Sequence, residues 1–238
     1  MADSTAPADT TATLWRPALA EFFATLLFVF LGPCAVVVTG MMEPAMTPAR
    51  LAVIALAHGL AIVALATASG PISGGHINPA VTIGALVTGK ITTMRAVWYI
   101  VAQLAGAVAG SILLSIVVGG SGSGLGSHGL GTNTSMVQGL IAEVILTFAL
   151  VGVIFATAVD PRGLGGIATI AIGFTVLIDH LAGVPLTGAS MNPARSFGPW
   201  LLTQNVDFVT HIVVYWVGPI AGGILAALVY ENVFMHRD

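Results

Sequence analysis

The sequence predicts an all-α membrane protein with six transmembrane helices and two short re-entrant half-helices, arranged as an inverted repeat. Three observations indicate this fold. Hydrophobic residues make up 56% of the 238-residue chain and charged residues only 7%, whereas a soluble domain has about 25% charged residues. Six apolar stretches are long enough to cross a bilayer. Two Asn-Pro-Ala triplets, 78–80 and 192–194, interrupt the apolar sequence, one in each half.

The six spans are expected where roughly 18 to 24 apolar residues follow one another, since that length crosses about 30 Å of hydrocarbon. They are 17–39, 50–69, 95–118, 136–159, 166–184 and 211–234. Residues 1–14 are expected to form a polar N-terminal tail, and 15–235 a single membrane domain with repeat halves 15–118 and 136–234. The first apolar run is too long for the core of a signal peptide, so it is interpreted as a retained span.

The distribution of basic residues predicts the orientation. Six crossings put both termini on one side of the membrane, and most Lys and Arg residues fall on that side: Arg16, Lys90, Arg95, Arg162 and Arg237. Only Arg50 and Arg195 lie elsewhere. The positive-inside rule therefore predicts cytoplasmic termini in a multi-pass integral membrane protein. A plasma or inner membrane and a vacuolar-type membrane fit the sequence equally well.

Each triplet has the residues that begin a helix, because asparagine is a favoured N-cap and proline is favoured at the first helical position. The six residues concerned are Asn78, Pro79, Ala80, Asn192, Pro193 and Ala194. The apolar stretches that follow span about 10 residues, too short to cross, so they are expected to enter the membrane and return. The first should run from Pro79 to Thr88, and the second should kink or end early at Pro199.

The two halves match outside the triplets as well. Glu21 and Glu143 occupy corresponding positions, as do His58 and His180. Pairs of glycines four residues apart should let helices pack closely; they are Gly106 with Gly110 and Gly218 with Gly222. Opposite topology of the halves would bring the two half-helix N-termini face to face near the bilayer midplane, where such repeats form a solute pathway.

Several classes of function find no support in the sequence. There is no nucleotide-binding loop, no cluster of metal ligands and no nucleophile–base pair, so neither an enzyme nor a cofactor is predicted. The net charge of -3 and the lack of a basic run argue against nucleic acid as a partner. The single cysteine, Cys34, cannot form an intrachain disulfide.

The segments 74–82 and 188–199 closely resemble the paired signatures of the aquaporin family, the major intrinsic proteins. The resemblance covers about residues 15–234, and the segments 70–76 and 156–161 are most similar to the plant tonoplast intrinsic protein type. It implies a passive channel for water that excludes protons and ions, with the lipid bilayer as its surroundings and a homotetramer as its assembly. Ammonia permeation is an extension within this class.

The resemblance also implies roles for individual residues. The selectivity filter falls on His58, His180, Ala189 and Arg195, with His128 at the spacing of a fifth filter residue in the ammonia-permeable type. Non-helical backbone before the triplets would line the pore with carbonyl groups; it comprises Gly74, Gly75, His76, Ile77, Gly188, Ser190 and Met191. In the family, the buried acids Glu21 and Glu143 hold the re-entrant loops by accepting backbone hydrogen bonds.

Some alternatives stay open at this stage. A glycerol or small neutral solute facilitator is the nearest, although those members usually carry aspartate where this chain has Ser196. A coupled secondary transporter would use Glu21 or Glu143 as a proton-relay acid. His76 could support its loop or gate the cytoplasmic side. Asp179 is expected to face outward or the lipid boundary, and the Gly/Ser-rich loop that carries His128 is expected to be flexible.

Overall fold

The computed structural model describes residues 9–235 and contains six helical spans within that range. Three spans are single helices: α1 (Thr11–Met42), α2 (Pro48–Ser73) and α4 (Thr93–Val118). The fourth is α5 (Met136–Ile154), which continues into the short helical turn η2 (Phe155–Val159). The fifth is η3 (Gly165–Ile167) followed by α6 (Ala168–Thr187). The sixth joins α8 (Phe208–Ile212), η4 (Val213–Val217), α9 (Gly218–Val229) and η5 (Tyr230–Phe234). All six predicted spans are present.

Several helices begin before the predicted apolar runs, because their capping residues lie outside those runs. α1 begins at Thr11, where the backbone N–H of Thr10 donates to Thr13 Oγ1 at 2.9 Å. The helix therefore takes in part of the stretch expected to be tail. Thr47 caps α2 by accepting from the N–H of Arg50, and a polar cap of this kind gives no signal in a hydropathy pattern.

Within each half, a glycine at the corresponding repeat position lets two helices pack closely, as predicted. A Cβ atom on Gly106 would lie 2.3 Å from the carbonyl oxygen of Phe22, and one on Gly222 would lie 2.3 Å from that of Val144. Any side chain at these positions would push α4 away from α1, or α9 from α5. The absence of a side chain lets the helix backbones touch.

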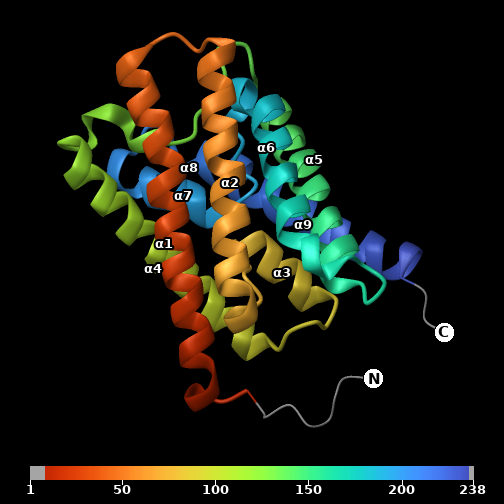
Figure 1. The fold of residues 1–238 in the computed structure, drawn as a ribbon. Helices are drawn as coiled ribbons and strands as arrows, with labels where there is room; N and C mark the ends of the chain where they lie inside the picture. The colour runs from red at the N-terminus through yellow and green to blue at the C-terminus, as the bar shows by residue number, and fades with distance from the viewer. Residues whose placement is uncertain (1–8, 236–238) are drawn as a thin grey trace.

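The two half-helices are α3 (Pro79–Val87) and α7 (Pro193–Thr203), and both lie between the long helices (Figure 1). Of the kink or early end expected at Pro199, the early end is wrong, because α7 continues through Pro199 to Thr203. α7 is held against α4, since a Cβ atom on Gly198 would lie 2.4 Å from the carbonyl oxygen of Ala107. That contact keeps the segment in place although Pro199 supplies no backbone N–H.

Polar contacts gather both described chain ends on one side of the bundle. Asp9 pairs with Arg95 at the start of α4 at 2.6 Å, and Lys90 pairs with Glu231 in η5 at 2.8 Å. Arg162, in the loop before α6, donates to the carbonyl oxygen of Phe234. Hydrogen bonds from Arg162, with those from Tyr230, lower the pKa of Asp160 below its usual range. Residues 1–8 and 236–238, and with them Arg237, lie outside the described part of the chain.

Candidate functional site: a pore between two helix starts

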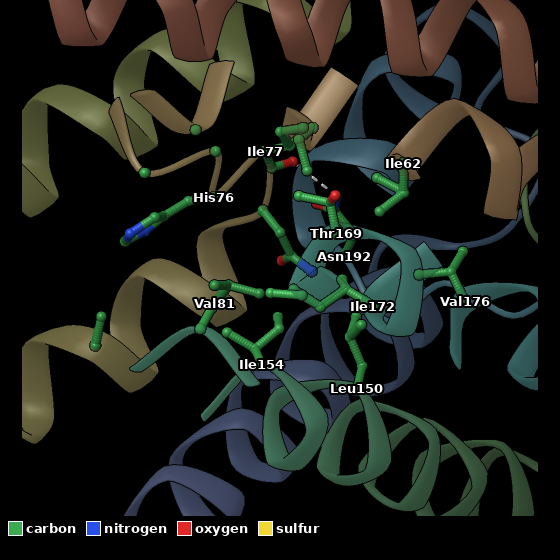
Figure 2. Close-up of a pocket in the computed structure, with 18 of the residues that line it drawn as sticks. Ile62, His76, Ile77, Val81, Leu150, Ile154, Thr169, Ile172, Val176 and Asn192 are labelled. Atoms are coloured by element: carbon green, nitrogen blue, oxygen red, sulfur yellow. Dashed lines mark hydrogen bonds between the residues drawn. The ribbon is translucent and has the colours of Figure 1, made fainter. Parts of the chain in front are cut away.

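A cavity of about 400 Å³ leads into the molecule from the side of the chain ends. Lys90, Ile91 and Gly165 line it at that side, and His180 lines it at depth. Apolar side chains of α2, α3, α5 and α6 surround the Asn192 amide in Figure 2: Ile62, Val81, Leu150, Ile154, Ile172 and Val176. The wall therefore gives a solute few hydrogen-bonding partners before it reaches the triplets.

The two triplets meet, and each asparagine binds the backbone of the opposite half. Asn78 Nδ2 donates to the carbonyl oxygen of Met191 at 2.8 Å, and Asn192 Nδ2 donates to that of Ile77 at 2.9 Å. Each Oδ1 atom caps its own half-helix by accepting from the N–H of Ala80 or Ala194. An amide nitrogen carries two hydrogens, so each asparagine keeps one N–H that these bonds do not use.

The backbone before each triplet adopts a conformation that side chains disfavour. Ile77 has φ 57°, its repeat partner Met191 has φ 52°, and Ala189 has φ 59°. A left-handed backbone costs a residue with a side chain roughly 1–2 kcal/mol. Such strain persists only where the surroundings hold it in place. The carbonyl oxygens of Ile77 and Met191 are the ones that accept from the opposite asparagines.

The two buried glutamates supply that hold. Glu21 accepts from the N–H groups of His76 (2.9 Å) and Ile77 (2.6 Å), and also from the Ser73 hydroxyl and Gln103 Nε2. Glu143 accepts in the same way from the second loop, whose donors are Thr187 Oγ1, Ser190 N and Met191 N. Every carboxylate oxygen of the two acids therefore accepts from at least one donor.

The four residues predicted for the filter come together beyond the triplets, on the side away from the chain ends. His58 and His180 stack with ring centroids 4.2 Å apart, and the Arg195 guanidinium reaches both His58 and the loop. Arg195 Nη1 donates to the carbonyl oxygen of Gly126 at 2.9 Å, and Nη2 lies 3.3 Å from His58 Nε2. Ala189, fully buried, lies beside Gly183 of α6.

The hydrogen bonds assign the tautomers of these two histidines. Nδ1 of His58 lies 2.9 Å from the carbonyl oxygen of Ile54, and Nδ1 of His180 lies 2.8 Å from that of Val176. A carbonyl oxygen can only accept, so each Nδ1 carries the proton and Nε2 is the acceptor of the neutral ring. Arg195 has only donors. It therefore requires the free lone pair of His58 Nε2, and His58 is neutral.

The loop that carries His128 is docked against the bundle, so the expectation of a flexible loop is wrong. Gly126 lies against Pro33 of α1, where a Cβ atom would come within 2.9 Å, and Gly131 N donates to the carbonyl oxygen of Leu186. Leu125 is fully buried. Glycine and serine predicted flexibility, but here the glycines permit close contact instead.

His128 itself is buried, with 5% of its surface exposed, and its ring stacks on Tyr215 at 5.4 Å. Its Nδ1 lies 2.7 Å from Ser196 Oγ, and Asn205 Nδ2 donates to its carbonyl oxygen. Burial, followed by the nearby Arg195 charge, lowers the pKa of His128 well below the ordinary value of 6.5. Burial therefore favours the neutral form of this ring.

Asp179 contradicts its sequence-based expectation. The side chain is 5% exposed instead of facing lipid, and its Oδ2 atom has no hydrogen-bond partner among the described residues. Asp179 lies one helical turn before Gly183 on the same face of α6, and Gly183 packs against Leu146 of α5. That face is turned toward α5, and the apolar pattern of the span does not indicate which face Asp179 takes.

Comparison with known proteins places these features in a family context. The model of the major intrinsic protein family matches residues 9–230. The chain is 47% identical over 221 residues to "Aquaporin TIP2-2" of Zea mays, covering 91% of this chain and 86% of that protein. It is 45% identical over 224 residues to "Aquaporin TIP2-1" of Arabidopsis thaliana, covering 92% and 88%. The solved aquaglyceroporin of Plasmodium falciparum has a similar fold, with a TM-score of 0.80 at 24% identity, covering 92% of this chain and 96% of that one.

Proposed function

Because this chain belongs to the major intrinsic protein family, we propose that its pore carries water in single file past the paired amides of Asn78 and Asn192. The protein is a passive water channel and not an enzyme. The reciprocal bonding of the two asparagines is the observation that carries the proposed route. It fixes both amides side by side at the end of an apolar-walled cavity.

Proton exclusion follows from the same arrangement. Each half-helix N-terminus carries roughly half a positive charge, and α3 and α7 direct these ends toward one point. A water that accepts from the free N–H groups of Asn78 and Asn192 must point its own hydrogens outward. The hydrogen-bonded file then reverses polarity at this water, and a cation meets a positive field; the handling of ions by half-helix dipoles is a known property of such pores.

The first prediction is water conduction without coupling to an ion gradient. Vesicles that contain the purified chain should shrink faster than empty vesicles in stopped-flow osmotic jumps, while their proton permeability stays at the lipid baseline. Light scattering and an internal pH dye measure the two rates. Solute uptake that depends on a proton or sodium gradient would instead establish the coupled-transporter alternative.

We propose His58, His180, Ala189 and Arg195 as the selectivity filter, with His128 as its fifth member. Arg195 is 2% exposed and bears the only charge of this group, since His58 and His128 are neutral by their surroundings. The stacked imidazoles narrow the passage, and the guanidinium repels cations. A glycerol-sized solute would have to part this stack, which favours water over the glycerol-facilitator alternative.

Ammonia is the proposed additional solute, because the filter offers bare imidazole nitrogens to a solute rich in N–H groups. His58→Phe replaces the imidazole that accepts from Arg195 with an apolar ring, and should lower ammonia flux by roughly threefold or more relative to water flux. His128→Ala should have a smaller effect. The measurement is internal alkalinisation after an ammonium pulse, with water flux recorded on the same vesicles. Wild-type ammonia entry no faster than in empty vesicles would leave a water-selective channel.

We further propose a homotetramer with cytoplasmic termini. The outer faces of α1, α2, α5 and α6 expose large apolar side chains that suit lipid or neighbouring subunits, among them Phe23, Leu60, Ile145 and Phe174. Lys90, Arg95 and Arg162 lie on the side of the chain ends. Their position there supports a cytoplasmic location for that side.

A further inference from the structure

A chain of hydrogen bonds joins His128 to the start of the second half-helix. Its members are two serine side chains. Ser196 Oγ lies between His128 Nδ1 and Ser190 Oγ, and Ser190 Oγ donates to the carbonyl oxygen of Asn192 at 3.2 Å. All of these groups are buried, so water does not compete for the bonds.

The carbonyl at the end of this chain gives its bonds a direction. A hydroxyl has one hydrogen. When Ser190 donates that hydrogen to the Asn192 carbonyl, its oxygen accepts from Ser196. Ser196 has then used its own hydrogen, and it accepts from His128 Nδ1. In this arrangement the proton of the neutral imidazole is on Nδ1, and Nε2 is left as a bare acceptor.

In the first repeat half, a single hydroxyl connects an imidazole to the carbonyl of the N-cap asparagine. Thr82 corresponds to Ser196 in the repeat, and its Oγ1 donates to the carbonyl oxygen of Asn78 at 3.0 Å. His76 Nδ1 lies 3.0 Å from Thr82 Oγ1, whose hydrogen is used in that bond, so His76 donates to the hydroxyl oxygen. Each imidazole also contacts a tyrosine: His76 packs edge-on against Tyr99, and His128 stacks on Tyr215.

The two repeat halves take this imidazole from different segments: in the first half it belongs to the re-entrant loop itself, and in the second half it does not. Ser190 occupies the repeat position of His76, and the loop residue His128 supplies the ring. The loop ring lies directly on the re-entrant backbone, because a Cβ atom on Gly188 would come within 2.6 Å of His128 Cδ2. The carbonyl of the N-cap asparagine is the final acceptor in both halves.

We propose that Ser196 and Ser190 are positioning residues that fix the Nδ1–H tautomer of His128, and so make its Nε2 an acceptor within the filter. The buried Nε2 atom has no hydrogen-bond partner among the described residues, and neither does that of His180. Two bare acceptors near the Arg195 donors suit a neutral solute that donates hydrogen bonds. This inference rests on the proposed filter and on ammonia as a solute.

Removing the Ser196 hydroxyl tests the proposal. In Ser196→Ala, His128 loses its fixed partner and can carry its proton on Nε2, which would turn an acceptor into a donor. The ratio of ammonia to water permeability should fall by about two- to tenfold, the range expected for one lost hydrogen bond. Ser190→Ala should act in the same direction. Ser196→Thr retains a hydroxyl, as at Thr82, and should restore the wild-type ratio.

A second measurement reads the tautomer directly. Nitrogen-15 NMR of histidine-labelled full-length protein in bilayers distinguishes protonated from bare ring nitrogens, and a His128→Asn sample identifies the signals of His128. Wild type and Ser196→Thr should show a protonated Nδ1, and Ser196→Ala a mixture of tautomers. This result does not depend on transport, so it separates failure of the tautomer proposal from failure of the ammonia proposal.

Thr203→Ala is the matched control. Thr203 Oγ1 bonds Ser127 Oγ at 2.8 Å, one residue before His128, so its loss loosens the same loop without touching the serine chain. The ratio and the NMR signals should stay as in wild type. The proposal is overturned if Ser196→Ala keeps the Nδ1–H signal, or if Thr203→Ala lowers the permeability ratio as much as Ser196→Ala does.

Discussion

Arg195→Val is expected to keep osmotic water flow and to admit glycerol and urea. The substitution removes the only charge of the proposed filter and leaves the Gly126 carbonyl and His58 Nε2 free to face the pore. Removing a buried cation that narrows the opening should lower the barrier for these solutes by at least about 1.4 kcal/mol, which is about tenfold in rate. Stopped-flow swelling in water, glycerol and urea gradients measures the change.

Arg195→Lys separates charge from shape. Lysine retains the positive charge but lacks the planar fork that reaches Gly126 and His58 together. It should continue to exclude cations while admitting somewhat more neutral solute than wild type. A correctly folded Arg195→Val variant with an unchanged solute profile would remove Arg195 from the filter, whatever the lysine variant does.

Much of the fold could be predicted because its determinants are local. Apolar runs of membrane length gave the six spans, and Asn-Pro at 78–79 and 192–193 gave both half-helix starts. The glycines at 106 and 222 predicted close packing because nothing but a missing side chain allows two helix backbones to touch. These signals depend on residue type and spacing, and tertiary structure does not alter them.

The parts that could not be predicted depend on contacts between distant segments. The cross-bonds from Asn78 to Met191 and from Asn192 to Ile77 arise only when the two loops meet. The docked His128 loop and the buried Asp179 likewise result from neighbouring elements that cover them. Thr82 and Ser196 could have been found in the sequence, since both stand four residues after the triplet asparagines.

Glu21 and Glu143 accept different numbers of hydrogen bonds, so the same substitution should have unequal effects at the two positions. Gln103 adds a fourth donor to Glu21, whereas the corresponding residue in the second half is Pro219, which has no side-chain donor. Each oxygen of Glu21 accepts two hydrogen bonds. In Glu143, one oxygen accepts two and the other accepts only from Met191 N.

Glu21→Gln should therefore destabilise the protein more than Glu143→Gln. The new amide group donates and cannot accept, so in either orientation it opposes two buried donors at position 21. At position 143 it can turn toward the single donor, Met191 N. A buried donor left without a partner costs about 1–3 kcal/mol, so we expect a loss of about 2–6 kcal/mol at position 21 and about half that at position 143. Unfolding in detergent, with water flux measured per folded protein, compares the two.

The difference between the two variants also distinguishes loop support from proton transfer. If the carboxylates only hold the strained backbone at Ile77 and Met191, loss of flux should follow loss of folded protein in both variants. If either acid relayed protons, its glutamine variant would fold normally and lose a proton-dependent flux that the wild type shows. Equal stability of Glu21→Gln and Glu143→Gln would contradict the donor count, because the second donor pair at Glu21 would then contribute nothing to holding the first loop.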